Sequence, residues 1–127
     1  MITKIVLKLT YLTLSIGIIY LLNGCVYEEI TPKEIIVPDS VSFATDIIPI
    51  FDTNCNTAGC HSTNSITPDL TAANAWISLT FFGYVETSNP ESSQIYQKLT
   101  TGSMKGRATD QQIALILKWI EQGALND

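Results

Sequence analysis

The chain contains the stretch Cys55-Asn56-Thr57-Ala58-Gly59-Cys60-His61. It is a lengthened form of the Cys-x-x-Cys-His run, in which two thiols bond covalently to a haem and the adjacent imidazole binds the iron. Four residues separate these cysteines instead of two, so the additional pair must loop outward to keep the sulfurs at the spacing that the porphyrin requires. Gly59 favours such a loop because glycine adopts backbone conformations that other residues resist. The stretch therefore predicts Cys55 and Cys60 as attachment points and His61 as an axial iron ligand.

Two other chemistries are open to the same residues. Two cysteines five positions apart in an oxidising compartment can form a small disulfide loop. A thiol pair with a histidine can also contribute to a zinc site. Apart from Cys25 near its N-terminus, the chain has no further Cys or His, so a closed zinc site would need a carboxylate such as Asp52 or Asp69. Residue chemistry favours haem over a disulfide, and either of these over zinc or a free dithiol.

Met104 is the one thioether outside the N-terminal segment, because the other methionine is Met1. It lies in the polar, glycine-containing stretch 100–107. A soft sulfur donor on a loop opposite an imidazole is the His/Met arrangement that raises the potential of a haem and suits electron transfer. This count of thioether donors predicts Met104 as the second axial ligand of the iron. The alternative is that Met104 is an ordinary surface methionine.

The first 24 residues are predicted to be a lipoprotein signal peptide. A short basic start, Lys4 and Lys8, precedes an apolar run over 9–22 that is shorter than the ~20 residues needed to span a bilayer. The run ends in Leu22-Asn23-Gly24-Cys25, which resembles a bacterial lipobox. Cys25 would become the lipid-modified N-terminus, placing the protein in the bacterial cell envelope at the periplasmic or the cell-surface face. The alternative is an ordinary secretory leader with Cys25 unused.

The charge of the mature chain limits its partners. Removing residues 1–24 takes away two of the seven basic residues and none of the twelve acidic ones, which leaves a formal net charge of −7. Such a surface repels nucleic acid phosphates. It favours a redox partner protein with a basic docking patch, in addition to the membrane that the N-terminal lipid would enter.

The remaining length allows one domain. Residues 25–39 mix glutamates with prolines and show no amphipathic period, so they are predicted to be a flexible tether. The folded part is expected over 40–127. No internal repeat is present, and nothing in 62–71 alternates for long enough to predict a strand.

Four helical patterns follow one another in the folded part, which predicts an all-α fold. Ser42 can cap a helix that starts around 44–46 and runs toward Cys55, with Pro49 in its first turns. A short helix is expected over 72–79. Asn89-Pro90-Glu91 predicts a cap and the start of a helix to about Leu99. The strongest pattern begins at a capping box, Thr109 to Gln112, ends at Gly123, and repeats Ile113, Ile116, Leu117 and Ile120 at helical spacing.

The order of these parts resembles the class I c-type cytochromes, especially the small cytochrome c domains of bacterial lipoproteins related to the planctomycete-type cytochrome c. The resemblance covers 43–126. It rests on Phe43 with Asp46-Ile47-Ile48-Pro49-Ile50-Phe51, on Cys60-His61-Ser62, on Asp69-Leu70, on Asn89-Pro90-Glu91-Ser92-Ser93 with Ile95-Tyr96, and on Lys118-Trp119-Ile120-Glu121-Gln122-Gly123-Ala124.

The resemblance implies a small helical domain that encloses one covalently attached haem c, with Cys55 and Cys60 as attachment points, His61 as proximal ligand and Met104 as distal ligand. It also implies that Phe51 packs against the last helix, with Trp119 as its expected partner. The expected function is that of a membrane-anchored electron carrier and not an enzyme. The alternatives are a haem sensor or peroxidase-like protein with an open distal site, and a non-haem lipoprotein module with a disulfide.

Overall fold

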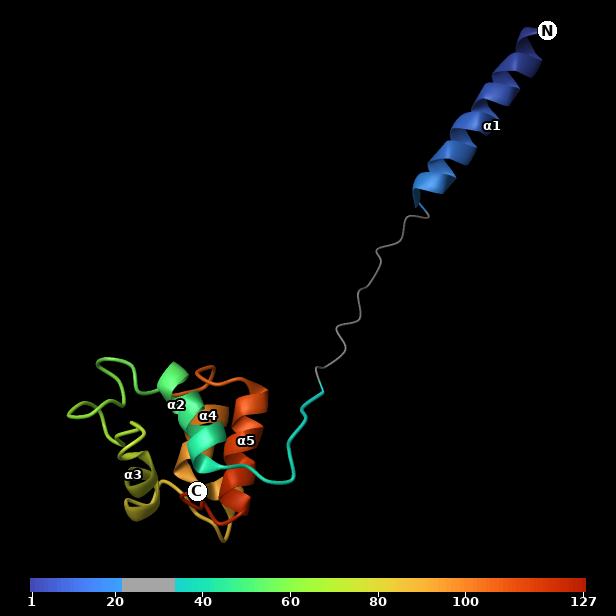
Figure 1. The fold of residues 1–127 in the computed structure, drawn as a ribbon. Helices are drawn as coiled ribbons and strands as arrows, with labels where there is room; N and C mark the ends of the chain where they lie inside the picture. The colour runs from blue at the N-terminus through green and yellow to red at the C-terminus, as the bar shows by residue number, and fades with distance from the viewer. Residues whose placement is uncertain (22–33) are drawn as a thin grey trace. The chain divides into compact units, whose positions relative to one another are not determined.

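The computed structural model describes residues 1–21 and 34–127, with side chains for 1–14 and 34–127. The chain divides into two compact units, Met1–Lys33 and Glu34–Asp127, and each is considered by itself (Figure 1). In the first unit the described element is α1, Ile2–Leu21. No helix in the described part of the chain combines the length and the apolarity needed to cross a bilayer. Cys25, the predicted lipidation site, lies outside the described residues.

The second unit is helical, and 34–127 contains no strand, so the predicted all-α class is confirmed for the described residues. Its elements are η1 (Phe43–Ile47), α2 (Ile48–Asn54), α3 (Ala75–Phe81), η2 (Pro90–Ser92), α4 (Gln94–Thr100) and α5 (Asp110–Glu121). Helix α5 packs against η1, η2 and α4. Figure 1 shows α3 and the long loop before it on one side of the unit, with α4 and α5 on the other.

The first helical segment begins at Phe43, one residue before the predicted start. The Ser42 side chain caps it by accepting a hydrogen bond from the backbone N–H of Thr45. Its first turn is a wide π turn, and the regular helix α2 starts at Ile48 with Pro49 in its first turn. A proline ring collides with the carbonyl four residues earlier in a regular helix. The wide turn before Pro49 is consistent with relief of that collision.

Helix α3 starts at Ala75, three residues later than predicted. The Asp69 side chain accepts hydrogen bonds from the backbone and hydroxyl of Thr71 and from the side chain of Asn74. These bonds flank a turn over 72–74. Thr71 and Asn74 could otherwise take part in starting a helix at 72. Because the Asp69 carboxylate binds both of them, the helix begins only after this turn.

The predicted continuous helix from Asn89 to Leu99 is wrong. It is broken at Ser93, whose extended backbone separates the short 3₁₀ turn η2 from α4. Ser93 is buried, and its hydroxyl exchanges hydrogen bonds with the backbone N–H and carbonyl of Glu86. Asn89 occupies the cap position of η2, but its side chain makes no capping hydrogen bond. The buried serine therefore decides where α4 begins.

Helix α5 confirms the strongest sequence pattern. The Thr109 side chain accepts from the backbone N–H of Gln112, and the Gln112 side chain accepts from the backbone N–H of Thr109. Gly123 follows the helix with a φ of +97°, a conformation that glycine adopts without strain. Ile116, Trp119 and Ile120 are fully buried, and Ile113 packs against the same core. Leu117, predicted on the same face, is only half-buried.

Three aromatic rings link the first and last helices. The ring of Phe51 lies edge-on to that of Phe43 at 6.4 Å between centroids, and Phe43 lies 5.0 Å from Trp119. The predicted contact between the first helix and Trp119 therefore runs through Phe43. The indole N–H of Trp119 donates to the carbonyl of Leu125, so burial leaves it satisfied.

Residues near the start of the second unit are fixed to α5. The backbone N–H and carbonyl of Ile36 both bond to the Gln111 side chain, at 3.1 and 2.6 Å. Val41 donates its N–H to the Gln122 side chain. The compact unit begins at Glu34, and the boundary at Ser40 stays a prediction.

The capping box makes a measurable contribution to stability. Replacing Thr109 with alanine is expected to lower the free energy of unfolding by about 1 kcal/mol, because the N–H of Gln112 loses its acceptor. In a domain of this size, such a loss corresponds to a fall of roughly 4–8 °C in Tm. Thr57→Ala, at an exposed loop position, is the matched control and should leave Tm unchanged. Equal melting of the two variants would contradict the role of the cap.

Candidate functional site

The predicted site residues meet at one cavity. Cys55, Cys60, His61 and Met104 all line a cavity of about 410 Å³, a volume typical of small-molecule and cofactor sites. The rest of its wall is mainly apolar and comes from the end of α2, the loop over 60–70, α3, α4 and the loop after α4. Its further lining residues are Phe51, Asn54, Ile66, Thr67, Pro68, Leu70, Leu79, Tyr84, Gln94, Ile95, Lys98, Leu99, Ser103 and Arg107.

The loop between the two cysteines shows how four intervening residues are accommodated. Cys55 follows the last residue of α2, and its carbonyl accepts from the N–H of His61 at 3.1 Å. Cys60 donates its N–H to the carbonyl of Thr57 in a tight turn, with Gly59 at a φ of +81°. Residues 57–59 are exposed. The additional residues therefore loop outward, as predicted, while both cysteines stay at the cavity.

The orientation of His61 is set by two backbone carbonyls. Its Nδ1 lies 3.1 Å from the oxygen of Ile66 and 3.0 Å from the oxygen of Pro68. A carbonyl oxygen can only accept, so Nδ1 must carry the proton in these bonds. In the neutral ring Nε2 then keeps its lone pair and is the atom that can bind a metal. The hydrogen bonds of Nδ1 to these carbonyls fix the orientation of the ring and make Nε2 a stronger ligand for a metal.

The two thiols are free and are not joined by a disulfide. Burial raises the pKa of the Cys55 thiol, while the nearby Arg107 acts to lower it and the neighbouring Cys60 to raise it. A raised pKa keeps the Cys55 thiol protonated at neutral pH, and a protonated thiol reacts slowly in disulfide exchange. The geometry therefore presents two separate sulfurs to the cavity.

The carboxylates considered for a zinc site do not join the cysteines. Asp52 accepts a hydrogen bond from the Asn56 side chain, and Asp69 is held by Thr71 and Asn74. Within 1–21 and 34–127, no three side chains of His, Cys, Asp or Glu gather closely enough to hold a metal ion. The four-ligand arrangement that structural zinc requires is not formed by these residues.

Asp69 stabilises the turn that follows the His61 loop. Hydrogen bonds, first from the hydroxyl of Thr71 and then from its backbone and from Asn74, lower the pKa of Asp69 from 3.8 to about 2. The next residue, Leu70, is buried and donates its N–H to the carbonyl of His61 at 2.8 Å. The Asp69 turn therefore adjoins the chain segment whose carbonyls hold the imidazole.

A pH dependence follows from this shift. Because the pKa of Asp69 is lower in the folded than in the unfolded chain, its charge stabilises the fold above about pH 4, and that contribution is lost as the pH falls from 4 toward 2. Asp69→Asn is expected to lower stability at pH 7 and to match the parent chain near pH 2. Urea unfolding at the two pH values measures the difference.

Glu86→Gln is the matched control, because hydrogen bonds from Ser88 also lower the pKa of Glu86, and this residue does not line the cavity. Both variants should show an acid-dependent loss of stability. Only Asp69→Asn should move the imidazole resonances of His61 in an NMR spectrum. If the His61 signals did not move in Asp69→Asn, the Asp69 turn would have no influence on the orientation of His61.

Met104 reaches the cavity from the loop after α4. Its N–H donates to the carbonyl of Lys98, and its carbonyl accepts from Arg107. The loop turns back closely on α4 at Gly102, where a Cβ atom would lie 2.8 Å from the Cα of Lys98. The Met104 side chain is half-buried and packs against the core.

Sequence reasoning missed the polar groups that line the cavity beside these residues. Lys98 and Arg107 are exposed cavity-lining cations, two of the four basic residues in 34–127. Tyr84 also lines the cavity. Basic residues are scarce in this acidic chain, and that scarcity is the one sequence signal that could have drawn attention to Lys98 and Arg107. Their spacing in the sequence does not connect them with the cysteines or with His61.

Comparison with family models, with curated proteins and with solved structures gives no match. The chemistry of the site is therefore judged from its own residues.

Proposed function

We propose that this chain is a membrane-anchored electron-transfer protein that carries one covalently bound haem c with His/Met axial ligation. The observation that supports the proposal is the meeting of Cys55, Cys60, His61 and Met104 at a single cavity, although Met104 is far from the others in sequence. Two sulfurs for attachment, one imidazole and one thioether are the donor set of such a haem. The protein would act as an electron carrier and not as an enzyme.

The residues present fit the cofactor in polarity as well as in donor type. The apolar wall suits a porphyrin ring, and Lys98 and Arg107 supply positive charge for its two carboxylates. Cys55 and Cys60 would hold the ring, and His61 Nε2 and the sulfur of Met104 would bind the iron. Bound haem would supply one-electron redox chemistry, which the protein tunes through axial ligands, hydrogen bonds and burial.

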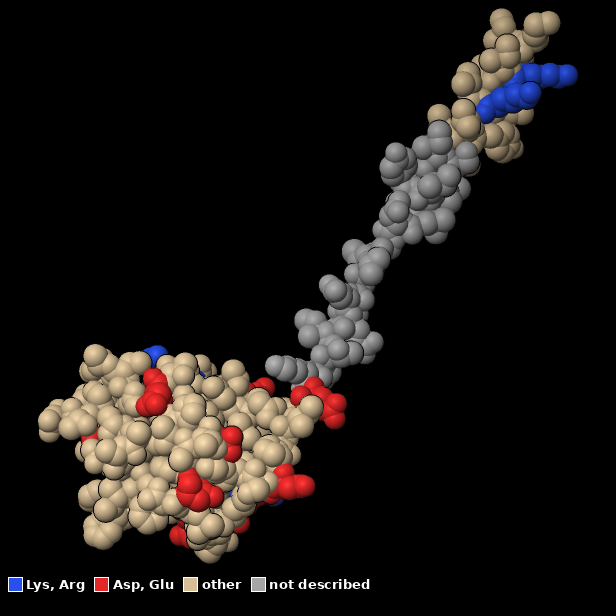
Figure 2. Space-filling view, in the orientation of Figure 1, with Lys and Arg blue, Asp and Glu red and all other residues tan. Residues whose placement is uncertain are grey.

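The remaining parts of the proposal concern location and partner. Lipidation of Cys25 would hold the protein at a membrane of the bacterial cell envelope, at its periplasmic or surface face. The acidic surface visible in Figure 2, with few basic side chains on that face, supports a redox partner with a basic docking patch. Ionic strength would weaken that attraction.

The deciding experiment is a spectrum of the chain purified from a bacterial host that has a haem-attachment system. The protein should remain coloured after acid extraction. Its ferric form should show the absorption at the red end of the visible range that is typical of sulfur bound to haem iron. A colourless protein with Cys55 and Cys60 joined in a disulfide would overturn the proposal in favour of a non-haem module. A coloured protein whose reduced form binds carbon monoxide without denaturant would instead indicate an open distal site, as in a sensor or peroxidase-like protein.

A further inference from the structure

A patch of three apolar side chains lies on the outer face of α3, away from the cavity just described. Ile77, Phe81 and Phe82 are 53%, 77% and 69% exposed. The rings of Phe81 and Phe82 pack edge-on at 5.4 Å between centroids, so they form one apolar surface. Scattered exposed apolar residues are normal, but a contiguous group on one face marks a surface that something else covers.

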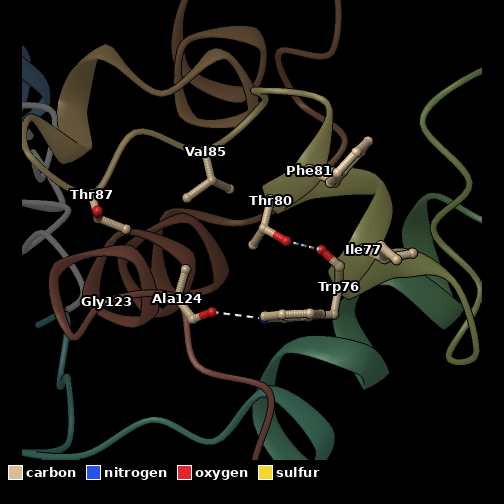
Figure 3. Close-up of a pocket in the computed structure, with 8 residues that line it drawn as sticks. All are labelled: Trp76, Ile77, Thr80, Phe81, Val85, Thr87, Gly123 and Ala124. Atoms are coloured by element: carbon tan, nitrogen blue, oxygen red, sulfur yellow. Dashed lines mark hydrogen bonds between the residues drawn. The ribbon is translucent and has the colours of Figure 1, made fainter.

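The patch borders a shallow depression of about 470 Å³ between α3 and the C-terminal segment. Figure 3 shows Thr80, Val85 and Ala124 facing this depression, while Ile77 and Phe81 point away from it on the outer side of α3. The indole N–H of Trp76 donates to the carbonyl of Ala124 at 2.8 Å. That bond links α3 to the end of the chain and provides a fixed base for the patch.

Charge is sparse on this part of the surface. Residues 71–85 contain no Lys, Arg, Asp or Glu, and none lines the depression. The exposed carboxylate of Glu86, which lies in the chain between the lining residues Val85 and Thr87, accepts hydrogen bonds from Ser88. One carboxylate offers little to a partner with a basic docking patch. An electrically neutral, apolar partner fits this surface better than a charged one does.

The size of the patch argues against a stable dimer. At roughly 200 Å² for each side chain, Phe81, Phe82 and Ile77 together offer about 400 Å² of surface. A stable protein interface needs about 800 Å² from each partner. A membrane surface has no such threshold, because exposed aromatic rings insert singly at the level of the lipid headgroups.

We propose that Ile77, Phe81 and Phe82 dock the folded unit onto the surface of a neutral lipid bilayer. The proposal rests on the proposed lipid anchor at Cys25, from which 11 residues lead to Ile36, the residue fixed to α5. Even fully extended, that chain reaches about 40 Å, and a small domain is about 30 Å across. The anchor therefore keeps the patch close enough for weak insertion to be effective.

The test is hydroxyl-radical footprinting of the whole lipidated, haem-loaded protein on vesicles of phosphatidylcholine. The reference in buffer is the Cys25→Ser chain, exported with an ordinary cleavable leader in place of residues 1–24 so that no apolar segment remains. Leu117, a half-buried residue of α5 that lines neither the cavity nor the depression, is the internal standard. Oxidation of Phe81 and Phe82 is expected to fall several-fold on vesicles, while Leu117 stays unchanged. Equal oxidation in the two samples would overturn the proposal.

A second measurement uses vesicle flotation of the unlipidated Cys25→Ser chain. Weak binding to phosphatidylcholine should be lost in Phe81→Ser/Phe82→Ser and kept in Ile35→Ser, at an exposed apolar residue that lines neither the cavity nor the depression. Because the chain is acidic, binding should weaken as phosphatidylglycerol is added. Stronger binding to the anionic vesicles, or a dimer in sedimentation that the double serine variant abolishes, would overturn the proposal in favour of charge or of a second copy.

Lipidation of Cys25 and attachment of haem are each measured independently of lipid binding by the patch. The mass of the intact protein reports lipidation of Cys25, and its visible spectrum reports the haem. If lipidation fails, flotation of the Cys25→Ser chain still decides whether the patch binds lipid.

Discussion

Replacing Cys55 and Cys60 together with serine is expected to give a colourless protein that melts at least about 20 °C below the parent chain. Serine hydroxyls do not bond to a haem, so the cavity of about 410 Å³ would lose its occupant. At about 24 cal/mol per Å³, an empty cavity of that volume corresponds to roughly 10 kcal/mol. The cavity is partly open to water, so this is an upper bound, but it is comparable to the whole stability of a small domain. Several kcal/mol suffice for the expected fall in Tm.

The experiment compares thermal melts by circular dichroism of proteins from a host that attaches haem. Ala58→Ser, in the same exposed loop, is the matched control, because it adds a hydroxyl beside the cysteines without removing a sulfur. It should retain both the colour and the melting temperature of the parent. If the double serine variant melted with the parent, the fold would not depend on the cofactor, and the empty cavity would have to be tolerated by the apolar residues around it.

A helix end can be predicted from the sequence when the groups that fix it are close neighbours in the chain. The capping box at Thr109 joins groups only three residues apart, so the start of α5 can be read from the sequence. The end of the helix at Gly123 is equally local, because the positive φ there favours glycine. Where both ends of an element are fixed by neighbours in the chain, the sequence predicts it closely.

The elements that were misjudged depend on groups that local patterns hide. The break before α4 requires Ser93 to be buried against the backbone of Glu86, seven residues earlier in the chain. The residues next to Ser93 give no sequence signal that its hydroxyl binds the backbone of Glu86. The late start of α3 had a readable cause, since an Asp two residues before a Thr is a common turn arrangement.

The candidate site divides in the same way. Cys55, Cys60 and His61 are close in sequence, and Met104 followed from counting the available sulfur donors. The carbonyls of Ile66 and Pro68 that orient His61 carry no signature, because every residue has a carbonyl. Donor chemistry could thus be predicted from residue types, whereas the groups that aim the donors are set by the path of the backbone.

Replacing Met104 with alanine is expected to convert a closed electron-transfer site into an open one. If the Met104 sulfur is the distal ligand, its removal abolishes the absorption at the red end of the ferric spectrum. The reduction potential should fall by a sizeable part of the roughly 0.8 V range over which axial ligands set haem potentials. The reduced form should then bind carbon monoxide without denaturant. Covalent attachment through Cys55 and Cys60 should be unaffected, so the protein stays coloured.

Ser103→Ala is the matched control, because Ser103 also lines the cavity from the same loop but offers no soft donor. It should keep the red-end absorption and exclude carbon monoxide. Were Met104→Ala to keep the red-end absorption, Met104 would not be the distal ligand. Were it to lose that absorption and still exclude carbon monoxide, another group would have to close the iron, and among the cavity-lining side chains Lys98 offers an amine. The pair Met104→Ala and Met104→Ala/Lys98→Ala decides between these cases, since only a lysine ligand would leave the single variant closed and the double variant open.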